Sequence, residues 1–290
     1  MKKALLFFIL LCSTTLLTAQ KKNTKSTLET RPFVLGEIRE INSKILLEKR
    51  SLNIYLPPGY KENNTQKFPV IYLLDGSADE DFINIVGLVH YNTFPWIDRM
   101  PQSIVVGIAN VDRKRDFTSP ATSELLKQHL PTAGGSEKFI SFIEKELQPF
   151  INENYRTDSG NKTIIGQSLG GLLATEILFK KPQLFNKYII VSPSLWWNDG
   201  ELLKLNPSLL NEDFTLKTDI YIGVGKEGLS PVFDNHVMEI DANILYDKIK
   251  YGKSKSVKTH FDYLPEEDHA TVTNPAVFNA FRLLYPKKEN

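Results

Sequence analysis

Cysteine is nearly absent from this sequence, and so is a surplus of charge of either sign. Cys12 is the single cysteine among 290 residues, which excludes a disulfide within the chain. Lys and Arg number 35 against 34 Asp and Glu, a net charge of +1 that gives no electrostatic reason to expect nucleic acid as a partner. No repeat or low-complexity segment occurs. The length and the 41% hydrophobic content are typical of one large α/β domain.

The first residues have the pattern of a secretory signal peptide, predicted over residues 1–20. Two lysines precede an apolar stretch at 4–17, and small residues follow. We expect cleavage near Ala19 or Gln20. Residues 21–32 are then a polar, flexible leader without periodicity. A periplasmic or secreted mature protein is the expected outcome.

Two other interpretations of this N-terminus are weaker. The apolar stretch is shorter than the roughly 20 residues that a membrane-spanning helix needs, which argues against an anchor. Leu11 precedes Cys12 where a lipoprotein signal would have a small residue. No second hydrophobic span follows, so we expect no transmembrane span and no thiol in the mature chain, whose single domain is predicted over residues 33–290.

The most informative stretch surrounds one serine, Ser168. Residues 163–167 are a short, largely apolar run, and residues 169–181 have the pattern of a helix that ends at Pro182. The turn between them, Gly166-Gln167-Ser168-Leu169-Gly170, fits the G-x-S-x-G nucleophile elbow, in which a sharp strand-to-helix turn exposes the serine. The glycines are needed because the backbone approaches itself closely there.

The remaining pattern alternates strands and helices. Apolar or alternating runs predict strands at 33–48, 51–56, 69–74, 103–109, 188–191, 217–223 and 257–264. Helical spacing appears at 80–100, 136–153, 235–251 and 276–284. The first two strands are expected to pair antiparallel. The whole predicts an α/β-hydrolase fold, with a mostly parallel central sheet and helices on both faces.

In such a sheet, ligands bind beyond the carboxyl ends of the strands. Glu227 follows the strand at 217–223, and His269 follows the strand at 257–264. Ser168, Glu227 and His269 therefore stand in the hydrolase order of nucleophile, acid and base. In this hypothesis His269 accepts the proton of Ser168, and the acid orients the imidazole.

Other residues compete for two of these roles. Asp268 and Asp219 are alternative acids, although Asp268 is adjacent to the histidine in the chain and neighbours rarely point at each other. The other four of the five histidines lie on or before helices or along the last strand. For the oxyanion hole we expect the N–H of Leu169 and an N–H from the loop at 75–78, with Ser77 favoured.

With these residues in place, the sequence resembles the putative-esterase family of α/β-hydrolases over residues 33–286. That family includes ferric-siderophore esterases, feruloyl and acetylxylan esterases, and S-formylglutathione hydrolase. The resemblance rests on the elbow and on the segments at 71–76, 110–120, 192–197 and 267–270. The segments at 110–120 and 192–197 are most similar to the siderophore-esterase branch. In that branch a glutamate often follows the strand corresponding to 217–223, which supports Glu227. The chain has Ser119-Pro120 where the family reads Thr-Pro.

Four further residues are candidates for substrate binding. Arg113 and Arg115 follow the strand at 103–109 and could bind an anionic ligand, or could hold their loop through ion pairs with carboxylates. Trp196 and Trp197 could stack on a ring of the substrate, although packing of at least one in the core is also expected.

The sequence thus predicts a serine hydrolase that cleaves a small carboxylic ester through an acyl-enzyme, with no metal and no cofactor. A siderophore trilactone is the leading substrate, and an acylated sugar is the alternative. A peptidase of the same fold is less favoured, because the chain has no room for a propeller or cap domain. A binding protein that kept the fold without catalysis stays open. The pattern does not indicate an oligomeric state.

Overall fold

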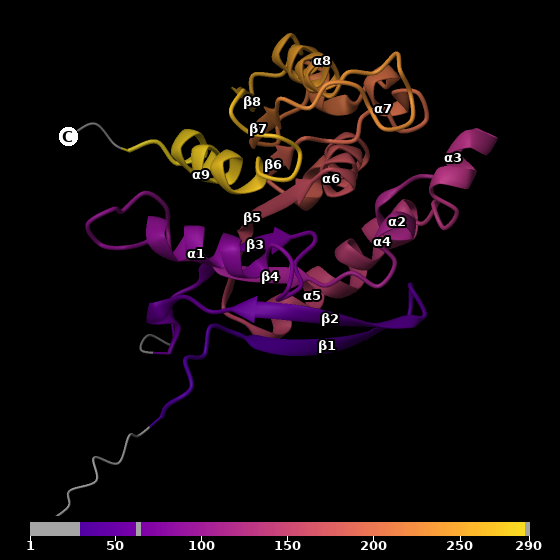
Figure 1. The fold of residues 1–290 in the computed structure, drawn as a ribbon. Helices are drawn as coiled ribbons and strands as arrows, with labels where there is room; N and C mark the ends of the chain where they lie inside the picture. The colour runs from indigo at the N-terminus through magenta and orange to yellow at the C-terminus, as the bar shows by residue number, and fades with distance from the viewer. Residues whose placement is uncertain (1–29, 62–64, 288–290) are drawn as a thin grey trace, which may run out of the picture. The chain divides into compact units, whose positions relative to one another are not determined.

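An eight-stranded sheet runs through the structure, a computed structural model that describes residues 30–61 and 65–287 (Figure 1). The described residues from Leu35 onward form one compact unit around it. The predicted signal peptide and residues 21–29 of the predicted leader lie outside the described residues. The strands are β1 (Glu37–Ser43), β2 (Glu48–Tyr55), β3 (Phe68–Leu73), β4 (Ile104–Ile108), β5 (Thr157–Gln167), β6 (Lys187–Val191), β7 (Thr218–Gly225) and β8 (Val257–Leu264).

The strand order is β1-β2-β4-β3-β5-β6-β7-β8. β1 and β2 form an antiparallel pair, and β2 joins β4 antiparallel. All neighbours from β4 to β8 are parallel. The predicted α/β-hydrolase fold, including the antiparallel opening pair, is therefore confirmed. Because β3 to β8 run the same way, their carboxyl ends share one edge of the sheet.

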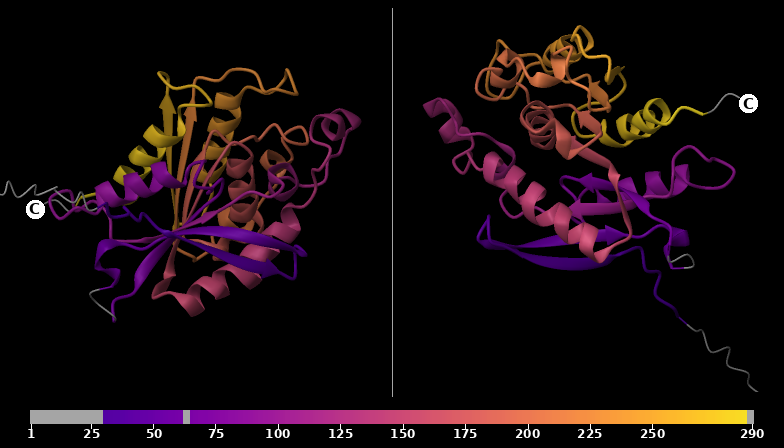
Figure 2. Two further views of the ribbon diagram at one scale, coloured as in Figure 1. Left: turned by 60° about the horizontal axis from the view of Figure 1, so that its bottom comes forward. Right: turned by 180° about the vertical axis from the view of Figure 1, so that it is seen from behind.

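Helices cover both faces of the sheet, as the two views in Figure 2 show. Their bounds are α1 (Phe82–Asn92), α2 (Arg113–Phe117), α3 (Glu124–His129), α4 (Ser136–Phe142), α5 (Gln148–Asn154), α6 (Leu169–Lys180), α7 (Glu201–Lys204), α8 (Met238–Lys250) and α9 (Thr273–Leu284). α1 and α9 pack together on one face. α4, α5, α6 and α8 bury their apolar residues on the other.

The two cores follow from the alternation of side chains along each strand. In β3, Val70 and Tyr72 belong to the core under α6, whereas Ile71 and Leu73 belong to the core under α1 and α9. All four are 1% exposed. A strand buried on both faces has no polar side, which is why residues 69–74 form a continuous apolar run.

The structure differs from the sequence prediction in several helical segments, and the helix expected at 80–100 covers only Phe82–Asn92. The helix expected at 136–153 is interrupted between α4 and α5 by a π-helical turn at Ile143–Leu147, where the Gln148 N–H bonds the Ile143 carbonyl. Pro149 has no N–H to continue the regular helical ladder, which accounts for an interruption at this point. The short helices α2, α3 and α7 were not predicted, because four to six residues are too few for a periodic pattern.

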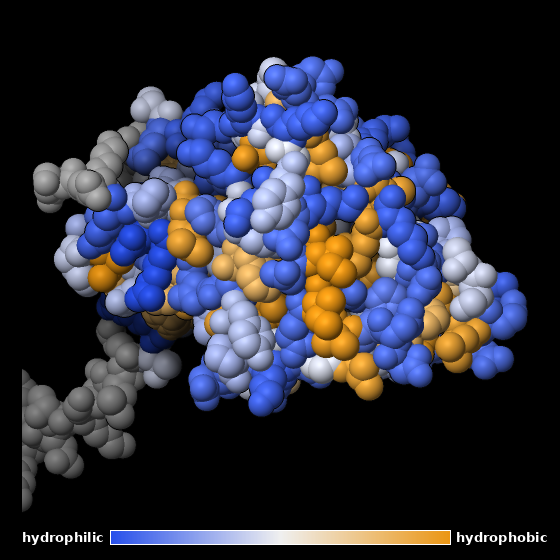
Figure 3. All heavy atoms as spheres, turned by 90° about the horizontal axis from the view of Figure 1, so that it is seen from above, coloured by the Kyte–Doolittle hydropathy of each residue, from blue (hydrophilic) through white to orange (hydrophobic). Residues whose placement is uncertain are grey.

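Seen from above, the surface is mostly hydrophilic, with a strip of apolar residues near the middle (Figure 3). The exposed apolar side chains include Leu229, Ile240 and Ile244. Within the described parts of the chain, no helix has both the length and the apolar character to span a bilayer.

Candidate active site

Ser168 stands at the sharp turn between β5 and α6. Its backbone has φ 59° and ψ −120°, a conformation that non-glycine residues rarely adopt. A Cβ on Gly166 would lie 2.3 Å from the carbonyl oxygen of Gly170, so this position tolerates only glycine. The strained turn lifts the Ser168 hydroxyl above the edge of the sheet, at the N-terminus of α6.

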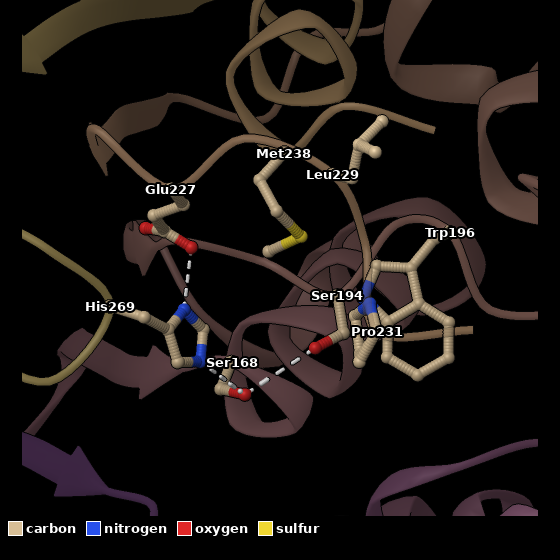
Figure 4. A pocket seen from close by; sticks show the side chains of 8 residues that line it. All are labelled: Ser168, Ser194, Trp196, Glu227, Leu229, Pro231, Met238 and His269. Atoms are coloured by element: carbon tan, nitrogen blue, oxygen red, sulfur yellow. Dashed lines mark hydrogen bonds and ion pairs between the residues drawn. The ribbon is translucent and has the colours of Figure 1, made fainter. Parts of the chain in front are cut away.

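The structure brings Ser168, His269 and Glu227 into one hydrogen-bonded chain (Figure 4). The Ser168 Oγ lies 3.0 Å from His269 Nε2. On the other side of the ring, His269 Nδ1 lies 2.5 Å from Glu227 Oε2. With Nδ1–H donating to the carboxylate, Nε2 is left to accept the serine proton. The arrangement is that of a nucleophile, a base and an orienting acid.

Glu227 is held from two sides. Its side chain is 3% exposed, and the Ser192 hydroxyl donates to Oε1 while His269 occupies Oε2. Its backbone N–H donates to the Glu239 carboxylate at 2.8 Å, in the first turn of α8. Ser192 and Glu239 were not singled out from the sequence. The position of Ser192 directly after β6, at the sheet edge that carries the site, could have identified it. Glu239 is one of several acidic residues on a helix, and its sequence position gives no indication of a role in the site.

The two alternative acids have other positions. Asp268 accepts from the backbone N–H groups of Ala270 at 2.8 Å and Thr271 at 3.1 Å, so it shapes the turn that carries His269. Those backbone hydrogen bonds lower the pKa of Asp268. Asp219 lies near the start of β7, far along the strand from Glu227. Neither carboxylate bonds the imidazole.

The loops that carry Glu227 and His269 are joined to each other and to the elbow. The Lys226 N–H donates to the Glu267 carbonyl at 2.7 Å. A Cβ on Gly225 would lie 2.7 Å from the same carbonyl, so the strand end must be glycine for the two loops to meet. Gln167 Nε2 donates to the His269 carbonyl at 3.0 Å. A backbone hydrogen bond from Lys226 and a side-chain hydrogen bond from Gln167 therefore hold the loop that carries the imidazole.

The two residues predicted for the oxyanion hole are in different situations. Leu169 is the first residue of α6, so its N–H has no acceptor within the helix and is available to a ligand. The Ser77 N–H donates to the Glu80 carboxylate over 3.3 Å, a long bond on an exposed loop. The roles of both N–H groups stay predictions.

Both predicted substrate-binding arginines are engaged within the protein. Arg113 forms a fork on the Asp75 carboxylate, with Nε at 2.6 Å and Nη2 at 2.9 Å, and Nη2 also donates to the Gln167 carbonyl at 3.2 Å. Arg115 donates to Asp116 at 2.8 Å and to Glu48 at 2.7 Å. Neither lines the pocket at Ser168. Of the two alternatives drawn from the sequence, the ion pairs with carboxylates are present, and a role of either arginine in substrate binding stays a prediction.

The two tryptophans lie in different positions relative to the pocket. Trp196 lines the pocket beside Ser168. Trp197 is 1% exposed and donates its Nε1–H to the Ser119 hydroxyl at 3.0 Å. Both rings belong to the core, with Trp196 4% exposed, so stacking on a substrate ring stays a prediction for Trp196 alone, which also lines the pocket.

The pocket has a volume of about 260 Å³ and opens beside the Ser168 hydroxyl. Its lining consists of Ser168, Ser194, Trp196, Glu227, Leu229, Pro231, Met238 and His269 (Figure 4). Ser194 lies in the motif at 192–197, with its Oγ 3.4 Å from that of Ser168. The apolar residues from the loop between β7 and α8 escaped the sequence analysis, because the direction of a loop side chain has no periodic signal. Among residues 30–61 and 65–287, no group of three or more His, Cys, Asp or Glu is arranged to hold a metal ion.

The fold and the order of these residues define the class: an α/β-hydrolase with the serine-hydrolase arrangement. The chain belongs to the family described as Putative esterase, whose model matches residues 43–232. It is 29% identical over 280 residues to the ferri-bacillibactin esterase BesA of Bacillus subtilis, covering 86% of this chain and 90% of that protein.

Two solved structures are similar as well. An IroE-like serine hydrolase from Shewanella oneidensis is 30% identical with a TM-score of 0.75, over 86% of this chain and 80% of that one. The BES protein from Bacillus cereus is 26% identical with a TM-score of 0.75, over 89% and 99%. The resemblance to the esterase family, closest to siderophore esterases among its branches, is thereby confirmed.

Proposed function

We propose that the protein hydrolyses carboxylic esters through an acyl-enzyme on Ser168. The observation that carries the proposal is the contact chain from Ser168 Oγ to His269 Nε2 and from His269 Nδ1 to Glu227. Membership of the esterase family supports it.

In this mechanism His269 Nε2 takes the proton as Ser168 Oγ attacks the ester carbonyl. The negative charge on the carbonyl oxygen is met by the N–H of Leu169 and by the positive end of α6. Collapse of the tetrahedral intermediate breaks the bond to the alcohol, and the leaving oxygen takes the proton from Nε2. Water then attacks the acyl-enzyme, giving its proton to Nε2, and Ser168 recovers that proton as the acid leaves. Glu227 stabilises the imidazolium in each half-reaction.

The direct test is Ser168→Ala assayed on a short acyl ester. Turnover should be lost while the circular dichroism spectrum and the melting temperature stay close to those of the parent. Ser159→Ala is a matched control, since Ser159 is an exposed serine on the same strand, β5. Undiminished hydrolysis by Ser168→Ala would contradict the assignment.

A binding protein without catalysis is the alternative from another class. It gives no reason for a serine, a histidine and a carboxylate to be kept within hydrogen-bonding distance. A fluorophosphonate probe separates the two, because it reacts only with an activated hydroxyl. Labelling of the parent but not of Ser168→Ala supports an enzyme, and an unlabelled parent supports a binder.

For the substrate we propose a siderophore trilactone or a related depsipeptide first, and an acylated sugar second. The similarity to BesA along most of both chains supports the first choice, together with the motifs at 110–120 and 192–197. Arg113 and Arg115 do not support the siderophore as substrate, since their charges are paired with carboxylates within the protein. A panel of both ester classes, ranked by kcat/KM, tests the order.

We also propose that the protein is exported, with cleavage near Ala19 or Gln20. The pattern of lysines, an apolar stretch and small residues at the start of the sequence supports this. N-terminal sequencing of exported protein should begin near Gln20 or Lys21. Full-length protein beginning at Met1 in the cytoplasm would refute it.

A further inference from the structure

The pocket has two chemically different sides around the Ser168 hydroxyl. His269 Nε2 lies on one side, 3.0 Å from Ser168 Oγ, and Ser194 Oγ lies on the other at 3.4 Å. Figure 4 shows Trp196 and Pro231 grouped with Ser194, away from His269, while Leu229 and Met238 stand above them. The histidine and its carboxylate partner therefore lie on one side of the Ser168 hydroxyl, and Ser194, Trp196 and Pro231 lie on the other.

The chemistry of ester hydrolysis assigns a substrate part to each side. The leaving oxygen has to take the proton from His269 Nε2, so the alcohol part lies on the histidine side. The acyl part remains bound to Ser168 Oγ and therefore lies on the other side of the pocket, next to Ser194. Its neighbours there are Trp196, Leu229, Pro231 and Met238, all uncharged, and the Ser194 hydroxyl.

No cation is available on that side. Lys and Arg are missing from the pocket lining, as far as the described residues show, and Arg113 is paired with Asp75. The ionisable groups of the lining are the Glu227 carboxylate and the His269 imidazole, which are bonded to each other. A carboxylate on the acyl group would therefore be buried against apolar side chains without a partner, near another negative charge.

We propose that Trp196, Leu229, Pro231 and Met238 form an acyl subsite that takes an uncharged alkyl or aryl acyl group and rejects one with a free carboxylate. This inference rests on the proposed function and names the acyl class that the same site accepts. Met238 sets the depth of the subsite. It is the first residue of α8, 4% exposed, and its N–H is fixed to the Gly228 carbonyl at 2.9 Å. Leu229 is 61% exposed and forms part of the rim.

Three esters that differ in the presence and position of one negative charge test the two sides of the pocket separately. Ethyl butyrate is neutral. Monoethyl succinate has the same alcohol but a carboxylate in place of the terminal methyl group of the acyl chain. O-butyrylglycolate has the same acyl group, with the carboxylate on the alcohol. We expect kcat/KM for monoethyl succinate to fall at least about 100-fold below that for ethyl butyrate, because its carboxylate is buried unpaired. O-butyrylglycolate should exceed monoethyl succinate at least about tenfold for the same reason.

Two variants test the assignment of the residues. Leu229→Lys should raise the ratio of monoethyl succinate to ethyl butyrate about tenfold, since it supplies the missing cation. Leu205→Lys, a substitution at another exposed leucine outside the pocket, should leave this ratio unchanged. Met238→Ala should raise the ratio of ethyl octanoate to ethyl butyrate, because it deepens the subsite.

Fluorophosphonate labelling of Ser168 makes the outcomes distinguishable. If Ser168 is labelled and ethyl butyrate is hydrolysed, equal kcat/KM for the two carboxylates, or an unchanged ratio in Leu229→Lys, overturns the acyl subsite alone. If Ser168 is not labelled and none of the three esters is hydrolysed, the proposed function falls, and the subsite with it.

Discussion

Arg113 and Arg115 lie two residues apart in the short helix α2, yet they serve different regions of the molecule. Arg113 donates to Asp75 and to the Gln167 carbonyl, at the edge of the sheet that carries Ser168. Arg115 donates to Asp116 and Glu48, beside the opening hairpin. Residues two apart on a helix point in nearly opposite directions, so one helix can hold two unrelated networks. Proximity in sequence therefore did not give the two arginines a common role.

The Arg113 network joins the two loops predicted to form the oxyanion hole. Asp75 precedes Gly76 and Ser77 and has φ 53°, while Gln167 directly precedes Ser168. One guanidinium group bonds both loops, and Asn110 Nδ2 adds a bond to Asp75 at 2.7 Å. The distance between the two predicted oxyanion donors then depends on this contact.

The Arg115 network instead fixes α2 to β2. Asp116 is 1% exposed and accepts from Arg115 and from Arg50, which is fully buried. Glu48 accepts from both arginines as well. These four charged residues lie outside the lining of the pocket. We therefore expect them to stabilise the contact between α2 and β2 and to take no part in catalysis.

The largest expected effect is that of Arg113→Ala on catalysis. We expect kcat on a neutral ester to fall about 100-fold with little change in KM, because misplaced oxyanion donors stabilise the transition state poorly. Arg113→Lys should recover only part of the loss, since an ammonium group cannot form the fork on Asp75. Added guanidinium should partly restore kcat in Arg113→Ala. A rise in KM at constant kcat would instead indicate direct substrate contact.

The next effect concerns stability. Arg115→Ala should lower the free energy of unfolding by about 1–3 kcal/mol, since Asp116 keeps Arg50 but loses one charged partner. Urea denaturation measures it, and kcat on a neutral ester should stay within about threefold of the parent. A loss of kcat comparable to that of Arg113→Ala, at unchanged stability, would contradict the assignment of a purely structural role to the Arg115 network.

A smaller effect is expected on charge selectivity. If either arginine bound an anionic substrate, its replacement by alanine would raise KM for the anionic ester and spare a neutral one. Because both guanidinium groups are already paired with carboxylates, we expect the ratio of the two KM values to stay within about twofold in both variants. A selective rise for the anionic ester would restore the substrate-binding role predicted from the sequence.

The smallest effect is the pH dependence from Asp81, next to the Arg113 network. Burial, and then the charges of Asp75 and Glu80, raise the pKa of Asp81 to about 6 from 3.8. The folded protein therefore holds this proton to higher pH than the unfolded chain, and stability falls as pH rises from about 4 to about 6. Asp81→Asn should flatten the melting temperature over that range, with little change at pH 4. An unchanged pH profile would show that Asp81 titrates normally.

Sequence reasoning reached the fold and the three residues of the contact chain for a physical reason. The elbow motif marked Ser168. Because parallel strands place their carboxyl ends at one edge, Glu227 and His269 could be located from their positions after two later strands, and the family resemblance supported Glu227. The same reasoning could not tell where Arg115 and Trp197 point, because packing and ion pairs decide that. Nor could it find Met238, because the path of the irregular segment between β7 and α8 decides where the first residue of α8 lies.

The central claim is that Ser168 carries the acyl group during turnover. Acid quenching of the reaction with a p-nitrophenyl ester, followed by mass spectrometry of peptides, tests it most directly. We expect a burst of p-nitrophenolate and an acyl adduct on Ser168, both absent from Ser168→Ala. Steady hydrolysis without any adduct, or an adduct on the neighbouring Ser194 instead, would contradict it.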